Sequence, residues 1–215
     1  MSDQPVVGIV GGTGPQGRGL ARRLAQGGVD VVLGSRSADR ARDSALALGA
    51  GVRGADNGEC ARAAGVVVLA VPWGGHRDTL VALAGELAGK VLVDCVNPLA
   101  FDKLGAYPVP VPEGSAAQQA QALAPDATVV AAFHHLSAVT LLDESVQSVG
   151  SDVLVLGDDR EATDLVQALA ERIAGCRGIF AGRLRNAGQV EAMTANLIAV
   201  NRRYTAHAGL RVTDV

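Results

Sequence analysis

The stretch Val6-Val7-Gly8-Ile9-Val10-Gly11-Gly12-Thr13-Gly14-Pro15-Gln16-Gly17 decides the fold of this chain. Val6 to Val10 reads as a buried strand, and Gly17 to Gln26 reads as a helix with one apolar face. Between them, Gly12 to Gly17 matches the spacing G-x-G-x-x-G in the strand–loop–helix setting that a dinucleotide-binding loop requires. Gly12 is expected to make the tight turn, Gly14 to let backbone approach a pyrophosphate, and Gly17 to let the helix pack on the strand. The alternative is a glycine-rich turn without a ligand.

The end of the second strand predicts which dinucleotide is bound. Val29 to Leu33 is that strand, and Gly34-Ser35-Arg36 follows it without the carboxylate that usually accepts a bond from the ribose of NAD. Arg36 and Arg40 can pair with a 2′-phosphate, and Ser35 can donate to it. The pattern therefore favours NADP(H), against the alternative of an exposed arginine at a helix start.

Composition excludes several classes of protein. The 215 residues carry 19 Lys and Arg against 22 Asp and Glu, which is not the basic balance of a nucleic-acid-binding protein. No apolar run reaches the roughly 18 residues of a membrane helix, and the N-terminus lacks the basic start of a signal peptide. Cys60, Cys95 and Cys176 lie too far apart in sequence for a disulfide framework or a zinc site. We expect a cytoplasmic protein without a metal.

Short β-branched runs alternate with helical stretches along the chain. This alternation predicts an α/β fold, a doubly wound parallel (Rossmann) sheet with a smaller C-terminal α/β lobe. A proline-rich loop near residues 98–113 is expected to separate an NADP-binding half, residues 1–100, from a second half, residues 101–215. Further strands are expected at Gly65 to Val71, Val91 to Val96, Thr128 to Ala132, Val153 to Leu156 and Gly178 to Ala181. Further helices are expected at Ser37 to Leu48, Thr79 to Leu87, Ala116 to Leu123, Arg160 to Ile173 and Val190 to Tyr204. Ser37 is expected to cap its helix, and a capping box from Asp56 to Glu59 is expected to open a short one.

The ends of two further strands are expected to line the dinucleotide site, because ligands bind in the crevice beyond the carboxyl ends of parallel strands. Pro72-Trp73 follows the central strand and is expected beside the nicotinamide, although the tryptophan could simply cover apolar surface. His76 is expected either to touch the cofactor or to cap the next helix. Asn97-Pro98-Leu99 follows the next strand, where the alternative is a simple turn.

The histidine pair in Phe133-His134-His135-Leu136-Ser137-Ala138 follows another strand. Adjacent strand residues point to opposite faces, which is a poor spacing for metal chelation. We expect one histidine in the core and the other facing the crevice. No G-x-S-x-G motif supports hydrolysis.

With these motifs together, the chain resembles the NADPH-dependent reductases of the 8-hydroxy-5-deazaflavin coenzyme, coenzyme F420. The resemblance rests on Gly11 to Gly17, Gly34-Ser35-Arg36, Val71-Pro72-Trp73, Asn97-Pro98-Leu99, Ala132-Phe133-His134 and Gly157-Asp158-Asp159. It implies a homodimeric oxidoreductase that transfers hydride between NADP(H) and F420, with the deazaflavin in a cleft between the halves. His135 stands where the family usually has Asn or Thr.

The resemblance also implies roles for single residues. The cofactor-binding residues are Gly12, Thr13, Gly14, Pro15, Gln16, Gly17, Ser35, Arg36, Arg40, Pro72, Trp73, His76, Pro98 and Ala138, of which Pro98 and Ala138 are expected to line the deazaflavin cleft. Those on the deazaflavin side are Asn97, Leu99, His134, Leu136, Ser137 and Ala208. No residue is strictly required as a catalyst, and His134 is the candidate for positioning the ring. The alternatives are an NADPH- or F420-dependent reductase of another C=N, C=O or C=C acceptor, and a non-catalytic NADPH-binding sensor.

Overall fold

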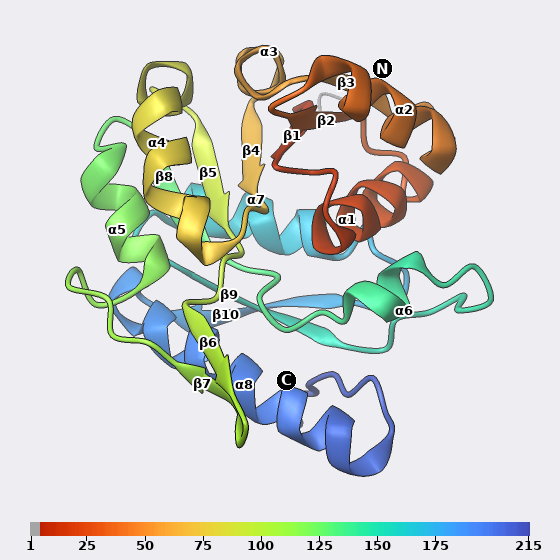
Figure 1. Ribbon diagram of the computed structural model, residues 1–215, viewed down its shortest axis with the longest axis vertical. Helices are drawn as coiled ribbons and strands as arrows, with labels where there is room; N and C mark the ends of the chain where they lie inside the picture. The colour runs from red at the N-terminus through yellow and green to blue at the C-terminus, as the bar shows by residue number, and fades with distance from the viewer. Residues whose placement is uncertain (1–4) are drawn as a thin grey trace.

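A computed structural model describes residues 5–215 (Figure 1), and its centre is one eight-stranded sheet. The strand order is β10-β9-β8-β5-β4-β1-β2-β3. The strands are β1 (Val7–Val10), β2 (Val31–Ser35), β3 (Arg53–Asp56), β4 (Val66–Leu69), β5 (Val91–Asp94), β8 (Thr128–Ala131), β9 (Asp152–Gly157) and β10 (Arg177–Gly182). The first half of the sheet and the second are joined by the pairing of β5 with β8.

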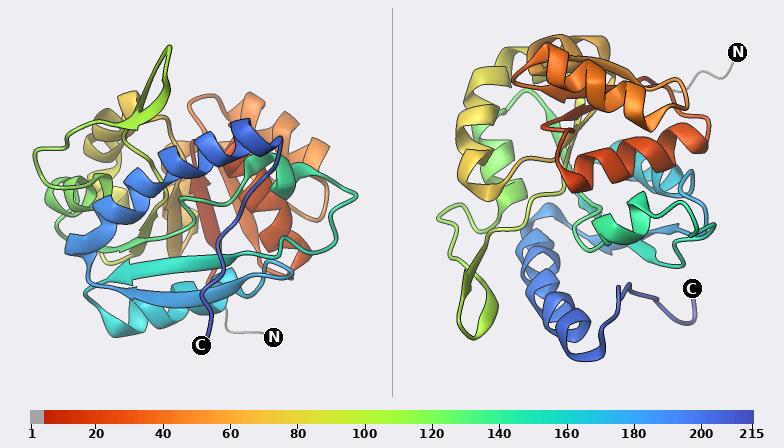
Figure 2. Two further views of the ribbon diagram at one scale, coloured as in Figure 1. Left: turned by 90° about the horizontal axis from the view of Figure 1, so that it is seen from below. Right: turned by 45° about the vertical axis from the view of Figure 1, so that its right-hand side comes forward.

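Helices cover both faces of the sheet, as Figure 2 shows. They are α1 (Pro15–Gln26), α2 (Ala38–Leu48), α3 (Asn57–Ala63), α4 (Trp73–Leu87), α5 (Ala116–Leu123), α6 (Ala138–Leu142), α7 (Arg160–Ala170) and α8 (Ala187–Tyr204), preceded by the 3₁₀ turn η1 (Leu184–Asn186). One core cluster joins the strands to α1 and α7, and the other joins them to α3, α4, α5 and the start of α8. The predicted doubly wound fold is confirmed.

Local capping explains why several helices begin where the sequence predicts. The Ser37 hydroxyl accepts a bond from the Arg40 amide at the start of α2, and the Asp56 carboxylate accepts from the Glu59 amide at the start of α3. Such caps satisfy amides that have no partner within the helix. The helix α4 begins six residues before the expected Thr79, because Gly74 and Gly75 hide its first turn from a propensity argument.

Strand direction differs from the sequence-based expectation in the second half. The strand β8 is parallel to β5, but β9 pairs with β8 in the antiparallel sense, and β10 runs parallel to β9. The chain between β8 and β9 contains only the five-residue helix α6, so it does not make the crossover that would return β9 parallel to β8. The start of β9 therefore lies at the same edge of the sheet as the end of β8.

The proline-rich segment contains a hairpin that the sequence analysis did not predict. Strand β6 (Leu99–Asp102) pairs antiparallel with β7 (Gly105–Pro108). The Asp102 carboxylate accepts bonds from the Leu104 and Gly105 amides, and Gly105 has φ +131° at the turn. Figure 1 shows this hairpin beside α8, away from β1, β2 and β3.

The short helix α6 was also missed, and a buried arginine holds it. Arg23, on α1, donates to the backbone carbonyls of Thr140, Leu141, Asp143 and Val146. These partners are more than a hundred residues away in sequence, so no local pattern indicates them.

Candidate functional site

The loops after β1, β2, β4, β5 and β8 meet at one edge of the sheet, because those five strands are parallel. The strand order reverses between β1 and β4, because β2 and β3 lie on one side of β1 whereas β4 and β5 lie on its other side. A crevice at such a switch point is where open α/β sheets bind their ligands. The sequence-predicted site residues of the glycine loop, Pro72-Trp73, Asn97-Pro98 and Phe133-His134 all lie on these loops.

The glycine loop has the local geometry expected of a phosphate-binding turn. A Cβ added to Gly17 would lie 2.5 Å from the Gly12 Cα, so this glycine allows α1 to pack against the loop. A Cβ on Gly12 would lie 2.6 Å from the Ile9 carbonyl oxygen. A Cβ on Gly14 would meet only the Gly11 carbonyl oxygen, at 3.9 Å. Gly14 is thus the one of the three glycines that is not required for packing, and the space beside it suits a phosphate.

The N-terminus of α1 adds a second feature that suits an anion. Gly14 is its N-cap, no side chain caps the helix, and Pro15 occupies the first turn. Free amides and the positive end of the helix dipole therefore face the loop. Thr13 is half-buried in this turn, and Gln16 lies at the helix start.

The groups expected to hold a 2′-phosphate follow β2. Ser35 is buried at the strand end, and its hydroxyl accepts a bond from the Ser37 amide. Arg36 and Arg40 are exposed, and within residues 5–215 neither forms a salt bridge. Both guanidinium groups are therefore available to an anionic ligand.

A clamp of three side chains holds the segment Phe133-His134. The Gln16 amide donates to the Phe133 carbonyl at 3.2 Å, and the Asn97 amide donates to the His134 carbonyl at 2.9 Å. The Thr194 hydroxyl, on α8, lies 3.3 Å from both the Asn97 amide oxygen and the His134 carbonyl. Phe133 itself has φ +65°, which is uncommon outside glycine. The clamp therefore holds a strained turn in place, and strain of this kind gathers at functional sites.

Gln16 and Thr194 contribute to the site in ways that the sequence analysis missed. Gln16 was expected only at a pyrophosphate, and Thr194 was not singled out at all. Thr194 lies sixty residues beyond His134, and no motif marks it. The nearest signal is the apolar periodicity of the last helix, which does not identify a polar residue facing the crevice.

His134 is buried, yet neither ring nitrogen has a hydrogen-bond partner among residues 5–215. Burial lowers its pKa, Asp94 opposes this shift and the neighbouring His135 adds to it, and the resulting pKa is about 4. The ring is therefore neutral at pH 7, with one N–H donor and one acceptor. Buried polar atoms without partners are rare in proteins. These two atoms fit a polar group of a bound ligand.

His135 has the structural role that was expected of one member of the pair. Its Nε2 donates to the Asp152 carbonyl at 2.6 Å, at the start of β9. Burial also lowers the pKa of His135 below its usual value, so it too is neutral. Both histidines are buried, and they lie in a turn beyond β8 and not in the strand itself.

His76 belongs to a buried polar network below Trp73. Its Nε2 lies 2.6 Å from the Asp94 carboxylate and its Nδ1 lies 3.0 Å from the Gln119 amide oxygen. The Gln119 amide nitrogen donates to Glu113, which fixes the orientation of the amide. Both ring nitrogens therefore face acceptors, as in an imidazolium. Burial lowers the pKa of His76, but the bonds to Asp94 and Gln119 outweigh it and raise the pKa above the usual value.

This network joins the start of α4, which follows β4, to the end of β5. His76 lies in the first turn of α4, with its ring 5.2 Å from that of Trp73, and Asp94 ends β5 and also accepts from the Val96 amide. The His76 side chain is fully buried and both its nitrogens are engaged. It has no ring nitrogen left for a cofactor, so we assign it to the support of Trp73 and not to direct contact.

The remaining sequence-predicted residues lie as follows. Pro72 is exposed and Trp73 half-buried at the start of α4, Pro98 is buried, and Leu99 begins β6. Leu136 is buried, Ser137 caps α6, and Ala138 is its first residue. The Ala208 amide donates to Asn201, and the chain beyond it is bonded to Ser151 and Asp152 at the start of β9.

Residues 5–215 contain neither a metal-binding cluster nor a helix that could span a membrane. No group of three or more His, Cys, Asp or Glu side chains is placed to hold a metal ion in this part of the chain. No helix in the same residues has the length and apolar character needed to cross a membrane.

This chain is similar in sequence to a family of redox enzymes. Residues 6–98 match the family model described as NADP oxidoreductase, coenzyme F420-dependent. The chain is 38% identical to the F420-dependent NADP reductase of Methanothermobacter marburgensis, over 97% of this chain and 98% of that protein. It is 34% identical to the protein of the same name from Methanocaldococcus jannaschii, with the same coverage.

Solved structures show the same fold. A putative F420-dependent NADP reductase from Arthrobacter sp. FB24 superposes with a TM-score of 0.84 at 26% identity, over 97% of this chain and 99% of that one. A pyrroline-5-carboxylate reductase from Coxiella burnetii gives 0.65 at 14% identity, which is a likeness of fold alone. That superposition covers 94% of this chain and 68% of the Coxiella burnetii chain. The full-length matches above 30% identity place the chain in the family of F420-dependent NADP reductases.

Proposed function

We propose that this protein transfers hydride between NADP(H) and coenzyme F420. The observation that carries the proposal is His134, which is buried just beyond β8 with neither ring nitrogen partnered within the part of the chain that the structure describes. A group with a hydrogen-bonding edge is needed there, and the carbonyl-bearing ring of a deazaflavin supplies one. Family membership and the glycine loop support the assignment of the second coenzyme as NADP(H).

On the NADP(H) side, the pyrophosphate lies at the loop from Gly12 to Gly17, with Thr13, Gly14, Pro15 and Gln16 around it. Ser35, Arg36 and Arg40 hold the 2′-phosphate, because Arg36 and Arg40 form no salt bridge within residues 5–215 and the residue directly after β2 is Arg36 and not a carboxylate. Pro72 and Trp73 line the nicotinamide side, and Pro98 and Ala138 line the adjoining deazaflavin cleft. Free helix N-termini at α1 and α4 favour anionic groups along this path.

On the deazaflavin side, His134 donates to a ring carbonyl. Asn97 and Thr194 hold the His134 backbone, and so they set where its ring points. Leu99, Leu136 and Ser137 line the cleft, and Ala208 lies on the segment that follows α8.

Orientation is the main contribution of the protein. When bound, the two coenzymes supply the hydride donor and the hydride acceptor. The protein must hold the two reacting carbons about 3–3.5 Å apart and keep water from the site. His134 has a pKa of about 4, so it is neutral and does not serve as a general acid at pH 7. No side chain is therefore required as a proton donor or nucleophile.

The decisive experiment mixes the protein with NADPH and F420 and follows the visible absorbance of the deazaflavin. Loss of that absorbance, at a rate that depends on enzyme, supports the proposal. NADPH oxidation by an imine or carbonyl compound without F420 would instead support another reductase. NADPH binding without turnover of any acceptor would indicate a sensor.

We also propose that the enzyme is a cytoplasmic homodimer. Large apolar side chains are exposed on the hairpin and α8, namely Phe101, Leu104, Tyr107, Val200 and Tyr204. Exposed apolar side chains that gather on one surface are typical of an interface, and a second copy of this chain is the occupant we propose. The three cysteines are buried free thiols, which suits a reducing compartment. Light scattering of the purified protein tests the dimer, and a monomeric mass would refute it.

A further inference from the structure

Glu191, on α8, is a buried carboxylate that neither coenzyme side described above uses. Only 2% of the residue is exposed. Its Oε2 accepts a bond from the Ala116 amide at 2.9 Å, and its Oε1 accepts from the Ala117 amide at 3.2 Å. These are the first two amides of α5, which have no partner within that helix. Glu191 therefore fastens the N-terminus of α5 to α8, from a position 75 residues further along the chain than Ala116.

The helix α5 already has an ordinary cap without Glu191. The Ser115 hydroxyl accepts a bond from the Gln118 amide at 3.0 Å, as an N-cap serine does. Burial raises the pKa of Glu191 and Asp94 adds to the rise, whereas the two α5 amides and His76 oppose it, and the resulting pKa is about 7. A charge that is costly to bury and is not needed as the cap of α5 points to a role in joining α5 to α8.

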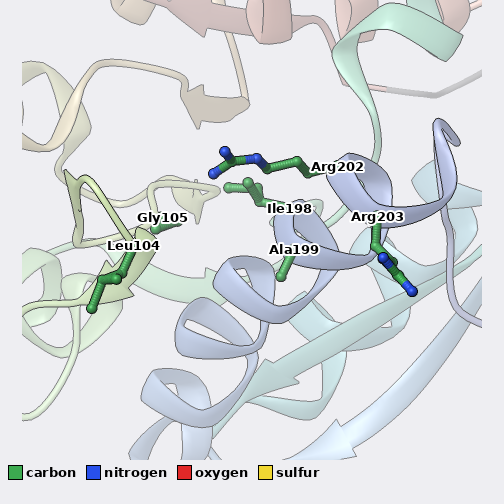
Figure 3. A pocket seen from close by; sticks show the side chains of 7 residues that line it. Leu104, Gly105, Ile198, Ala199, Arg202 and Arg203 are labelled. Atoms are coloured by element: carbon green, nitrogen blue, oxygen red, sulfur yellow. The ribbon is translucent and has the colours of Figure 1, made fainter.

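The first half of α8 determines where this helix lies. Its buried residues are Ala187, Val190, Glu191 and Ala195. A Cβ added to Gly188 would lie 2.9 Å from the Gly114 carbonyl oxygen, so the start of α8 packs closely against the segment before α5. The second half borders a pocket of about 380 Å³ beside the β6–β7 hairpin, where Figure 3 shows Ile198 and Arg202. Within one chain, the contacts around Glu191 therefore fix α8 more firmly than those of its second half.

Thr194 connects this junction to the deazaflavin side. It follows Glu191 by three residues, about 4.5 Å along the axis and on the same face of the helix. Its hydroxyl lies 3.3 Å from both the Asn97 amide oxygen and the His134 carbonyl. A shift of α8 at Glu191 therefore moves one member of the clamp that holds His134.

The helix α5 connects the same junction to the nicotinamide side. The amide oxygen of Gln119, on α5, lies 3.0 Å from the His76 Nδ1, and the His76 ring lies 5.2 Å from that of Trp73. Contacts between α5 and α8 therefore affect how Trp73 and His134 lie relative to each other. Hydride transfer is sensitive to that relation, because the two reacting carbons must be about 3–3.5 Å apart.

We propose that Glu191 is a positioning residue for hydride transfer, which joins α8 to α5 and thereby fixes His134 relative to Trp73. This inference rests on the proposed function. The carboxylate form accepts both α5 amides, whereas a protonated carboxyl directs an O–H at one of them. Ionised Glu191 is therefore the form that holds the junction.

Few other charges act on Glu191. Asp94 of β5 and His76 of α4 are the two that influence its ionisation. The helix α5 contains only Ala, Gln and Leu. The remaining ionisable side chains on the segments beside Glu191 are partly or fully exposed, namely Glu113, Tyr107 and Arg185.

The variant Glu191→Gln keeps the size of the side chain and removes its charge and one acceptor. It should lower kcat about 10–100-fold, because a misplacement of about 1 Å can cost on the order of 100-fold. The Kd of NADPH and of F420, each measured alone by fluorescence, should stay within about twofold. Glu161→Gln, which removes an exposed carboxylate from the first turn of α7, is the matched control. Wild-type kcat should rise as the pH rises through about 7, and this step should be absent from Glu191→Gln.

Thermal unfolding separates positioning from a purely structural role. The folded pKa of about 7 lies above the ordinary value of 4.5, so the contribution of Glu191 to stability is lost as the pH rises through 7. At pH 8, Glu191→Gln should therefore have a Tm no lower than that of the wild type, although its kcat is lower. A fall in Tm that accompanies the fall in kcat would overturn the proposal.

Nuclear magnetic resonance tests the same link without either coenzyme. The His134 ring signals should shift with a pKa of about 7 in the wild type and not in Glu191→Gln, although the pKa of His134 itself is about 4. His134 signals that do not respond to Glu191, or an unchanged kcat in Glu191→Gln, would overturn the proposal. If the wild type does not reduce F420, the proposed function fails, and the His134 signals still decide whether Glu191 positions this ring.

Discussion

The buried pair of His76 and Asp94 yields the sharpest prediction about this structure. Asp94→Ala leaves a buried imidazolium without its carboxylate, 2.6 Å away in the wild type, and leaves the Val96 amide without its acceptor. Removing one partner of a buried ion pair costs about 3–5 kcal/mol in free energy of unfolding. At about 2–4 °C per kcal/mol for a chain of this size, Tm should fall by about 6–20 °C.

Thermal unfolding of Asp94→Ala, His76→Ala and the double variant measures this coupling. If the pair is an imidazolium and a carboxylate, the double variant should lose clearly less stability than the sum of the single losses. Additive losses would refute the assigned ion pair.

The pH dependence gives an independent check on the same pair. The pKa of His76 is raised in the folded state, so its contribution is complete below the unfolded value of about 6.5. That contribution is lost as the pH rises through the higher folded pKa. Wild-type stability should therefore fall over this range, and Asp94→Asn, which keeps hydrogen-bonding atoms but no charge, should flatten the slope. An unchanged slope in Asp94→Asn would show that His76 does not titrate against Asp94.

Three further predictions concern the coenzyme sites. Arg36→Ala should raise the KM for NADPH about 10–150-fold more than that for NADH, because a charged contact contributes about 1.5–3 kcal/mol; equal losses would contradict the 2′-phosphate assignment. Gly14→Val should abolish NADPH binding with the fold retained, since a Cβ at Gly14 meets only one protein atom, at 3.9 Å. Gly17→Ala should instead unfold the loop. Calorimetric titration of NADPH and circular dichroism distinguish the two variants. His134→Ala should lower kcat and affinity for F420 with NADPH binding nearly intact, and a misplaced ring can cost on the order of 100-fold. Because the pKa of His134 is about 4, the wild-type pH–rate profile should show no titration of His134 near pH 6.5. A wild-type pKa near 6.5 that disappears in His134→Ala would show that His134 acts as an acid. His135→Asn is the paired control.

Local sequence patterns are enough to predict the dinucleotide-binding fold and the family of this chain. The glycine loop, the strand that precedes it and the helix that follows it are contiguous, so local spacing and hydrophobic pattern suffice to predict them. The helix caps Ser37 and Asp56 are equally local, and the structure confirms them. The predicted family is confirmed by relatives that match nearly the whole chain.

Tertiary structure alone decided the second half of the sheet and the immediate surroundings of His134. The antiparallel direction of β9 depends on a connection without a crossover helix, and the Thr194 contact joins residues sixty positions apart. The burial of His76 depends on Asp94 and Gln119, which lie on two other elements. These features arise from contacts between segments distant in sequence, and neither the period of a helix nor the spacing of a motif contains that information.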